Sequence, residues 1–196
     1  MGSARDSAPR WGGPSRLGSR VLKFVLDGLE NREAKHDIFV IDPLEYDLPV
    51  LRKPHFYYAP GEAPEVLEML ANKLAEADCF VLVTPEYNHS IPPALSNLLN
   101  HFGGSKYAYK TSGFVTYSSG QWGGQRAAMA LRTITSELGC LSVSRVCAIP
   151  RAAKDLDEDG APVEGSSSPK MLNGMLDQLE WAATAFKNHR AAVGTP

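Results

Sequence analysis

Apolar residues recur along this chain at two spacings, one typical of amphipathic helices and the other of short buried strands. Residues 17–29 follow the helical spacing, and Ile38-Phe39-Val40-Ile41 is an apolar run of strand length. The rest of the chain continues this alternation. The predicted helices are 64–77, 91–102, 123–138 and 169–188, and the predicted strands after 38–41 are 79–84, 111–117 and 143–149.

Alternating strands and helices predict a parallel sheet that carries helices on both faces. Right-handed crossovers in this order predict one doubly wound α/β domain over residues 1–196, flavodoxin-like with strand order 2-1-3-4-5. Residues 1–15 and the acidic, Gly/Ser-rich residues 155–168 are expected to be loops. Such a sheet opens with a central strand, but only Met1 precedes the Gly-Ser-Ala-Arg segment at 2–5. We therefore expect the first strand to be truncated.

The amino-acid composition argues against several classes of binding partner. The 196 residues are 43% hydrophobic and carry a formal net charge of -2, which gives no general attraction to nucleic acid or to an anionic membrane. The sequence shows neither a signal peptide nor an apolar run near the roughly 20 residues of a membrane span, so we expect a cytoplasmic protein. Cys79, Cys140 and Cys147 lack metal-type spacing and are expected to be buried, reduced thiols.

The strand that starts at Cys79 leads directly into Pro85-Glu86-Tyr87-Asn88. Open α/β sheets bind ligands just beyond the carboxyl ends of their strands, so this turn is placed to contact a planar ligand. Proline fixes the backbone, tyrosine offers an aromatic face, and backbone amides can bind the edge of a heteroaromatic ring. Taken alone, the segment fits an ordinary turn equally well.

Two further loops contain residues suited to ligands. Residues 118–124, Ser-Ser-Gly-Gln-Trp-Gly-Gly, follow another strand and combine hydroxyls with glycines that permit close backbone approach. Arg126 then opens a helix as either a surface residue or an anion contact. Residues 2–5 and 15–20 place Ser and Arg before the first helix, which suits a phosphate, although a disordered tail has the same composition.

Several other chemistries lack their motifs. The segment 13–20 has Ser-Arg where a nucleotide P-loop needs Lys-Ser/Thr, and no Gly-x-Gly-x-x-Gly opens a helix. A Gly-x-Ser-x-Gly nucleophile elbow is missing, and the histidines form no metal pair at helical spacing. We therefore predict neither a metal site nor a dedicated catalytic acid, base or nucleophile.

These motifs resemble the NADPH-dependent FMN reductase family, a branch of the flavodoxin-like superfamily that includes azo-dye, quinone and chromate reductases. The resemblance covers about residues 2–150 and rests on the Gly-Ser-x-Arg loop, the Pro-Glu-Tyr-Asn turn with its following helix start, and the Ser-x-Gly-x-x-Gly-Gly loop. The chain departs from the family in its nearly absent first strand and in residues 6–13, which resemble an insertion.

The resemblance implies FMN-binding roles at matching positions. The phosphate would contact Ser3, Arg5 and Arg16. The isoalloxazine ring and the third loop would involve Pro85, Glu86, Tyr87, Asn88, Ser118, Ser119, Gly120 and Gly123.

The implied activity is hydride transfer from NADPH or NADH through bound FMN to a small acceptor such as a quinone, an azo compound or free flavin. The cofactor carries this chemistry, so no catalytic side chain is assigned. The resemblance also implies a homodimer or homotetramer. Two alternatives stay open, a flavodoxin-type electron carrier and an inactive, truncated variant that acts as an interaction or regulatory partner.

Overall fold

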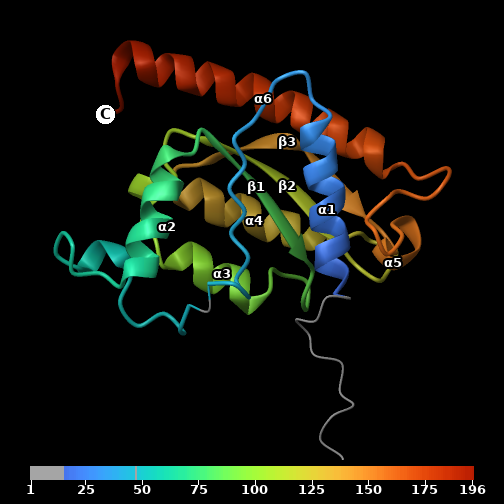
Figure 1. Cartoon of the computed structure of the whole chain (residues 1–196), viewed down its shortest axis with the longest axis horizontal. Coiled ribbons are helices and arrows are strands. Elements are labelled where there is room, and N and C mark those ends of the chain that lie inside the picture. The colour runs from blue at the N-terminus through green and yellow to red at the C-terminus, as the bar shows by residue number, and fades with distance from the viewer. Residues whose placement is uncertain (1–15, 47) are drawn as a thin grey trace, which may run out of the picture.

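The computed structural model of the protein describes residues 16–46 and 48–196 as one α/β unit (Figure 1). Helices and strands alternate along most of the chain. In order, the elements are α1 (Leu17–Glu30), the 3₁₀ turn η1 (His55–Tyr57), α2 (Glu65–Glu76), β1 (Cys79–Pro85), α3 (Pro93–Asn100), the 3₁₀ turn η2 (Gly104–Lys106), β2 (Thr111–Tyr117), α4 (Gln125–Glu137), β3 (Leu141–Ile149), α5 (Ala152–Asp155) and α6 (Ser168–Val193).

The three strands form one parallel sheet in the order β1-β2-β3. β1 pairs with β2 in unbroken register, from Cys79 opposite Thr111 to Pro85 opposite Tyr117. The β2–β3 register shifts once, between Ser112 and Phe114. Because all three strands run the same way, their carboxyl ends meet at one edge of the sheet.

Alternate residues of each strand enter two different cores. Phe80, Leu82 and Phe114 belong to a core that they share with α2, α3 and α4. Val81 and Val115 belong to the other core, which contains residues of α1 and α6. This division follows from the period of two along a strand, and it explains why the central strand β2 is buried at every position.

The strands beginning at Cys79, Thr111 and Leu141 confirm the three later strand predictions, and α1, α2, α3, α4 and α6 confirm the predicted helices within a few residues. The four-residue helix α5 was not predicted, because it is too short to show a period. The three cysteines are free, as expected; Cys140 and Cys147 are buried and Cys79 is partly buried.

The prediction of a strand at 38–41 is wrong. These residues have no helical or strand assignment, and the segment 36–42 passes beside β1 without pairing to it (Figure 1). A strand needs hydrogen bonds from a neighbour, and apolar character alone does not supply them. Across residues 16–46 and 48–196, no helix has the length and apolarity needed to cross a membrane.

Candidate cofactor site at the carboxyl edge of the sheet

Backbone hydrogen bonds close the turn that follows β1. Tyr87 and Ser90 exchange two backbone hydrogen bonds, each 2.9 Å from nitrogen to oxygen. Between them, Asn88 and His89 have φ angles of 49° and 65°, a left-handed conformation that few residues other than glycine adopt. The turn leaves the Tyr87 side chain 43% exposed. Its aromatic face is therefore accessible at the edge of the sheet.

Glu86 links this turn to the start of α4 through hydrogen bonds. Its Oε2 accepts a hydrogen bond of 3.0 Å from the backbone nitrogen of Arg126, and its Oε1 accepts one of 2.7 Å from Nη1 of the same residue. Burial acts to raise the pKa of the Glu86 carboxyl, but these hydrogen bonds outweigh burial and hold the pKa below its ordinary value. Glu86 is therefore held as an anion beside the start of α4.

The loop after β2 is bonded to the chain that follows β3. The Ser118 backbone nitrogen donates to the Ile149 carbonyl at 3.2 Å, and the Ser118 hydroxyl donates to the Gly120 carbonyl at 3.0 Å. The Arg151 backbone nitrogen donates to the same Gly120 carbonyl at 2.8 Å. These bonds hold the loop against the carboxyl end of β3.

The glycines of this loop differ in role. Gly123 has a φ of 61°, and a Cβ placed on it would lie 3.0 Å from the Ala148 carbonyl carbon. Gly124 has a φ of 77°, with a Cβ position 3.0 Å from the Tyr117 backbone nitrogen. Both glycines are therefore required by packing against β2 and β3. At Gly120 the nearest atom to a Cβ is 4.0 Å away, so the close-approach role suits this glycine best.

Arg16 lies at the start of α1, where it forms an ion pair with Asp42. Its Nε also donates to the Ser19 hydroxyl at 3.1 Å. Tyr117, at the end of β2, packs against the same end of α1, because a Cβ on Gly18 would lie 2.8 Å from the Tyr117 hydroxyl. The beginning of α1 thus lies against the carboxyl edge of the sheet.

A single cavity of about 1410 Å³ connects these loops. It is lined by seven of the predicted cofactor residues, namely Arg16, Pro85, Glu86, Tyr87, Ser118, Ser119 and Gly120. Asn88 and Gly123 are not part of its lining. The predicted phosphate contacts Ser3 and Arg5 fall outside the described residues.

Three residues of this region were missing or unresolved in the sequence interpretation. Asp42 and Tyr117 both line the cavity. Asp42 follows the apolar run 38–41 and Tyr117 ends the predicted strand 111–117, so their position at the end of a predicted strand offered a signal for them. Arg126 was left open between a surface residue and an anion contact. The structure pairs it with a protein carboxylate, Glu86, which no local spacing in the sequence indicates.

The sequence model for NADPH-dependent FMN reductases matches residues 1–154. A quinone reductase from Escherichia coli (strain K12) is 31% identical over 126 residues, 63% of this chain and 64% of that protein. The chain thus aligns with just under two thirds of that relative. An NADPH azoreductase from Bacillus sp. (strain OY1-2) is 23% identical over 194 residues, 96% of each chain.

The fold is similar to that of a solved flavoenzyme. FerB, an NAD(P)H:(acceptor) oxidoreductase from Paracoccus denitrificans, aligns with a TM-score of 0.68 at 20% sequence identity. The alignment covers 93% of this chain and 94% of FerB. At this level of identity the comparison establishes a common fold.

Proposed function

Because this chain belongs to the NADPH-dependent FMN reductase family, we propose that it binds FMN at the carboxyl edge of its sheet and uses NADPH or NADH to reduce a small acceptor. The proposed acceptors are a quinone, an azo compound or free flavin, by analogy with the quinone reductase and azoreductase relatives. The proposal includes a cytoplasmic homodimer or homotetramer. It also includes a flavodoxin-like strand order of 2-1-3-4-5 with a truncated first strand.

One observation carries this proposal. Residues from α1, from the turn after β1 and from the loop after β2 line the same cavity, although they are far apart in the sequence. Parallel strands place their carboxyl ends at one edge, where ligands of open α/β sheets bind. The proposed site therefore coincides with the place that the fold provides for a ligand.

The residues present fit the ring of FMN. Tyr87 offers an exposed aromatic face beside the rigid Pro85, and the hydroxyls of Ser118 and Ser119 lie across the same cavity. A planar ring buries apolar area against the tyrosine and the proline, and it finds polar partners in the serine loop. Arg16 lines the cavity and is the described residue proposed for the phosphate, where it would share its charge with Asp42.

When bound, FMN supplies the hydride chemistry itself. The chain's own residues bind and orient. Glu86 and Arg126 hold the turn that carries Tyr87, and this lowers the entropy cost of ordering that turn around a ligand. Burial raises the pKa of Tyr117 to about 12, so its phenol keeps its proton at neutral pH. Tyr117 therefore lines the site as an uncharged side chain.

FMN binding tests this proposal first. The purified chain should quench flavin fluorescence at a stoichiometry of one FMN per chain, and the loaded protein should then oxidise NADPH in the presence of a quinone. Tight FMN binding without NADPH oxidation would favour the electron-carrier alternative. Failure to bind FMN under any reconstitution condition would refute the proposal.

A further inference from the structure

Tyr117 is the last residue of β2, and its side chain lies against the first turn of α1. Val115 and Tyr117 are two positions apart and therefore face the same side of the sheet, in the core that contains residues of α1. Tyr117 is only 9% exposed, and it lines the cavity together with Gly18 of α1. A buried tyrosine thus lies where β2, α1 and the candidate cofactor site meet.

The Tyr117 hydroxyl occupies space that a larger residue on α1 would fill. A Cβ on Gly18 would lie 2.8 Å from the hydroxyl oxygen and 3.9 Å from Nε of Arg16. Buried tyrosine hydroxyls usually have a hydrogen-bond partner, as Tyr107 does at the Leu99 carbonyl, 3.4 Å away. Within residues 16–46 and 48–196, the Tyr117 hydroxyl has no such protein partner. It is therefore a polar group that a ligand in the cavity could satisfy.

The neighbouring end of α1 lacks a capping side chain. Arg16 is the N-cap residue, its side chain makes no capping hydrogen bond, and the first turn contains no acidic residue. The backbone N–H groups that open a helix have no partners within the helix and attract anions. The Tyr117 hydroxyl therefore lies beside other donors that suit an anionic group.

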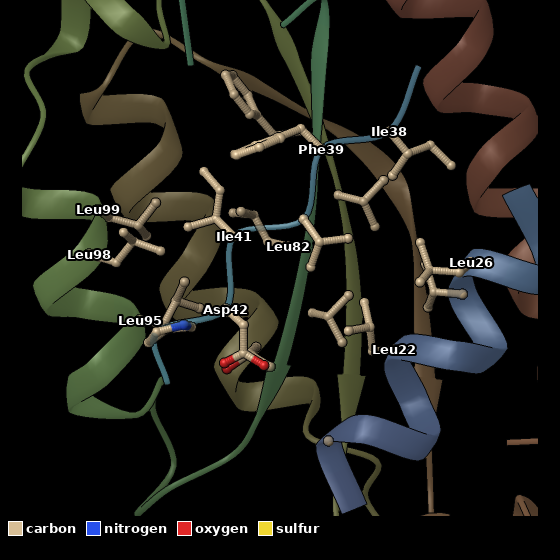
Figure 2. A pocket seen from close by; sticks show the side chains of 18 of the residues that line it. Leu22, Leu26, Ile38, Phe39, Ile41, Asp42, Leu82, Leu95, Leu98 and Leu99 are labelled. Carbon is tan, nitrogen blue, oxygen red and sulfur yellow. The ribbon is translucent and has the colours of Figure 1, made fainter. Parts of the chain in front are cut away.

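The cations that line the cavity are already paired with protein groups. Arg16 contacts Asp42, and Figure 2 shows the Asp42 carboxylate among the aliphatic side chains of the cavity wall, such as Leu22 and Leu82. The lysines of the lining also have partners: Lys35 bonds to the Glu30 carbonyl, Lys73 to Glu76 and Lys187 to Asp78. A phosphate in the cavity would meet partly neutralised cations, so it would need further donors from uncharged groups.

Packing alone does not account for a tyrosine at this position. A phenylalanine would fill the apolar part of the same space, and alanine favours a helix more than glycine does. The chain instead combines Gly18 on α1 with a hydroxyl on β2. Burial raises the pKa of Tyr117 to about 12 although Arg16 acts to lower it, so the hydroxyl keeps its proton and can donate.

Resting on the proposed function, we propose that the Tyr117 hydroxyl donates a hydrogen bond to the phosphate of FMN and thereby selects FMN over riboflavin. A hydrogen bond to an ionised acceptor is stronger than one between neutral groups. Arg16 and the first N–H groups of α1 supply the other donors on this side of the cavity. Riboflavin has no phosphate, so it leaves the hydroxyl without this partner.

Paired titrations with FMN and riboflavin test this role without any turnover. Fluorescence quenching gives the dissociation constant of each flavin for the wild type and for Tyr117→Phe, which keeps the ring and removes only the hydroxyl. We expect Tyr117→Phe to weaken FMN binding about tenfold, as for the loss of one charge-assisted hydrogen bond, and to leave riboflavin binding within about twofold. Tyr58→Phe is the matched control and should change neither, because Tyr58 is partly buried against the other core and lies outside the cavity lining.

The two flavins separate the possible failures. An unchanged FMN affinity in Tyr117→Phe, or an equal loss for both flavins, would overturn the role of the hydroxyl and leave FMN binding by the chain intact. A wild type that binds neither flavin would refute this role and the proposed function together.

A double-mutant cycle with Gly18 tests the contact itself. Gly18→Ala places a methyl group where the hydroxyl lies, so it should weaken FMN binding about fivefold or more and leave riboflavin binding nearly unchanged. In the Tyr117→Phe background the same substitution meets no hydroxyl and should have no further effect on FMN binding. Equal losses in the two backgrounds would show that the methyl group acts without the hydroxyl, and this would overturn the proposal.

Discussion

Glu86 receives hydrogen bonds from both the backbone nitrogen and the guanidinium of Arg126, at 3.0 Å and 2.7 Å. The two residues are 40 positions apart and join the turn after β1 to the first turn of α4. The Glu86 side chain is 9% exposed and the Arg126 side chain is 40% exposed, so solvent screens this pair in part. The position of the Tyr87 face depends on this connection.

Removing the charge of Glu86 should destabilise the fold. We expect Glu86→Gln to lower the free energy of unfolding by about 1–3 kcal/mol, because a buried carboxylate loses charge-assisted hydrogen bonds. The measurement is urea denaturation. Glu76→Gln is the matched control, since Glu76 is 67% exposed in its pair with Lys73 and should change stability by less than about 0.5 kcal/mol. Equal effects of the two substitutions would contradict the structural role of Glu86.

The same pair predicts a pH dependence. The folded-state pKa of Glu86 lies below its ordinary value of 4.5, so the unfolded chain takes up a proton first as the pH falls. The contribution of Glu86 is therefore complete above pH 4.5 and is lost as the pH falls through the folded-state pKa. The difference in unfolding free energy between the wild type and Glu86→Gln should shrink over this range. A difference that grows on acidification would reverse the assignment.

The glycines of the loop after β2 should respond differently to alanine. Gly123→Ala forces a side chain into a left-handed conformation against the β3 backbone, and we expect a loss of about 1–3 kcal/mol. Gly120→Ala meets open surroundings and should stay within about 0.5 kcal/mol of the wild type. Thermal and urea unfolding of both variants measure this contrast. A neutral Gly123→Ala would show that the loop relaxes freely.

The three cysteines should be unreactive in the native protein. Burial raises the pKa of Cys79 and of Cys140 to about 11 and that of Cys147 to about 12, so little thiolate exists at neutral pH. A chromogenic thiol reagent should label none of them rapidly in buffer and all three in denaturant. Rapid labelling of one thiol in buffer would show that its surroundings open readily.

The sequence was most informative where an apolar run leads directly into a polar turn. The run beginning at Cys79 forms strand β1, because a continuous apolar segment followed by a polar turn has few other stable structures. The run at 38–41 is equally apolar but remains unpaired. Strand formation there depends on a neighbour, and local pattern does not report whether a neighbour is present.

The candidate site was predictable in its location and less so in its internal contacts. Six of the predicted residues around the cavity lie at or just beyond the carboxyl ends of β1 and β2, where open α/β sheets bind ligands, and the seventh, Arg16, came from the family resemblance. The packing role of Gly123 depends instead on the β3 backbone beside it, and the role of Arg126 depends on its ion pair with Glu86. Those contacts join positions far apart in the sequence, and a single sequence carries no signal for such pairs.

Aromatic contact with the flavin ring should depend on Tyr87. Tyr87→Ala should weaken FMN binding about tenfold or more, because stacking area is lost while the turn itself stays closed by backbone hydrogen bonds. Tyr57→Ala is the control, since Tyr57 is 69% exposed and lies outside the cavity. Fluorescence titration of FMN compares the two. Equal affinities would remove Tyr87 from the ring contact.

Anaerobic reduction of the FMN-loaded protein by NADPH tests the central claim most directly. The account predicts that the yellow colour of the loaded protein bleaches after one equivalent of NADPH or NADH, and that addition of a quinone restores it. Bleaching and recovery should both weaken in Tyr87→Ala and persist in Tyr57→Ala. A loaded protein that stays oxidised with both nucleotides would contradict the proposed reductase.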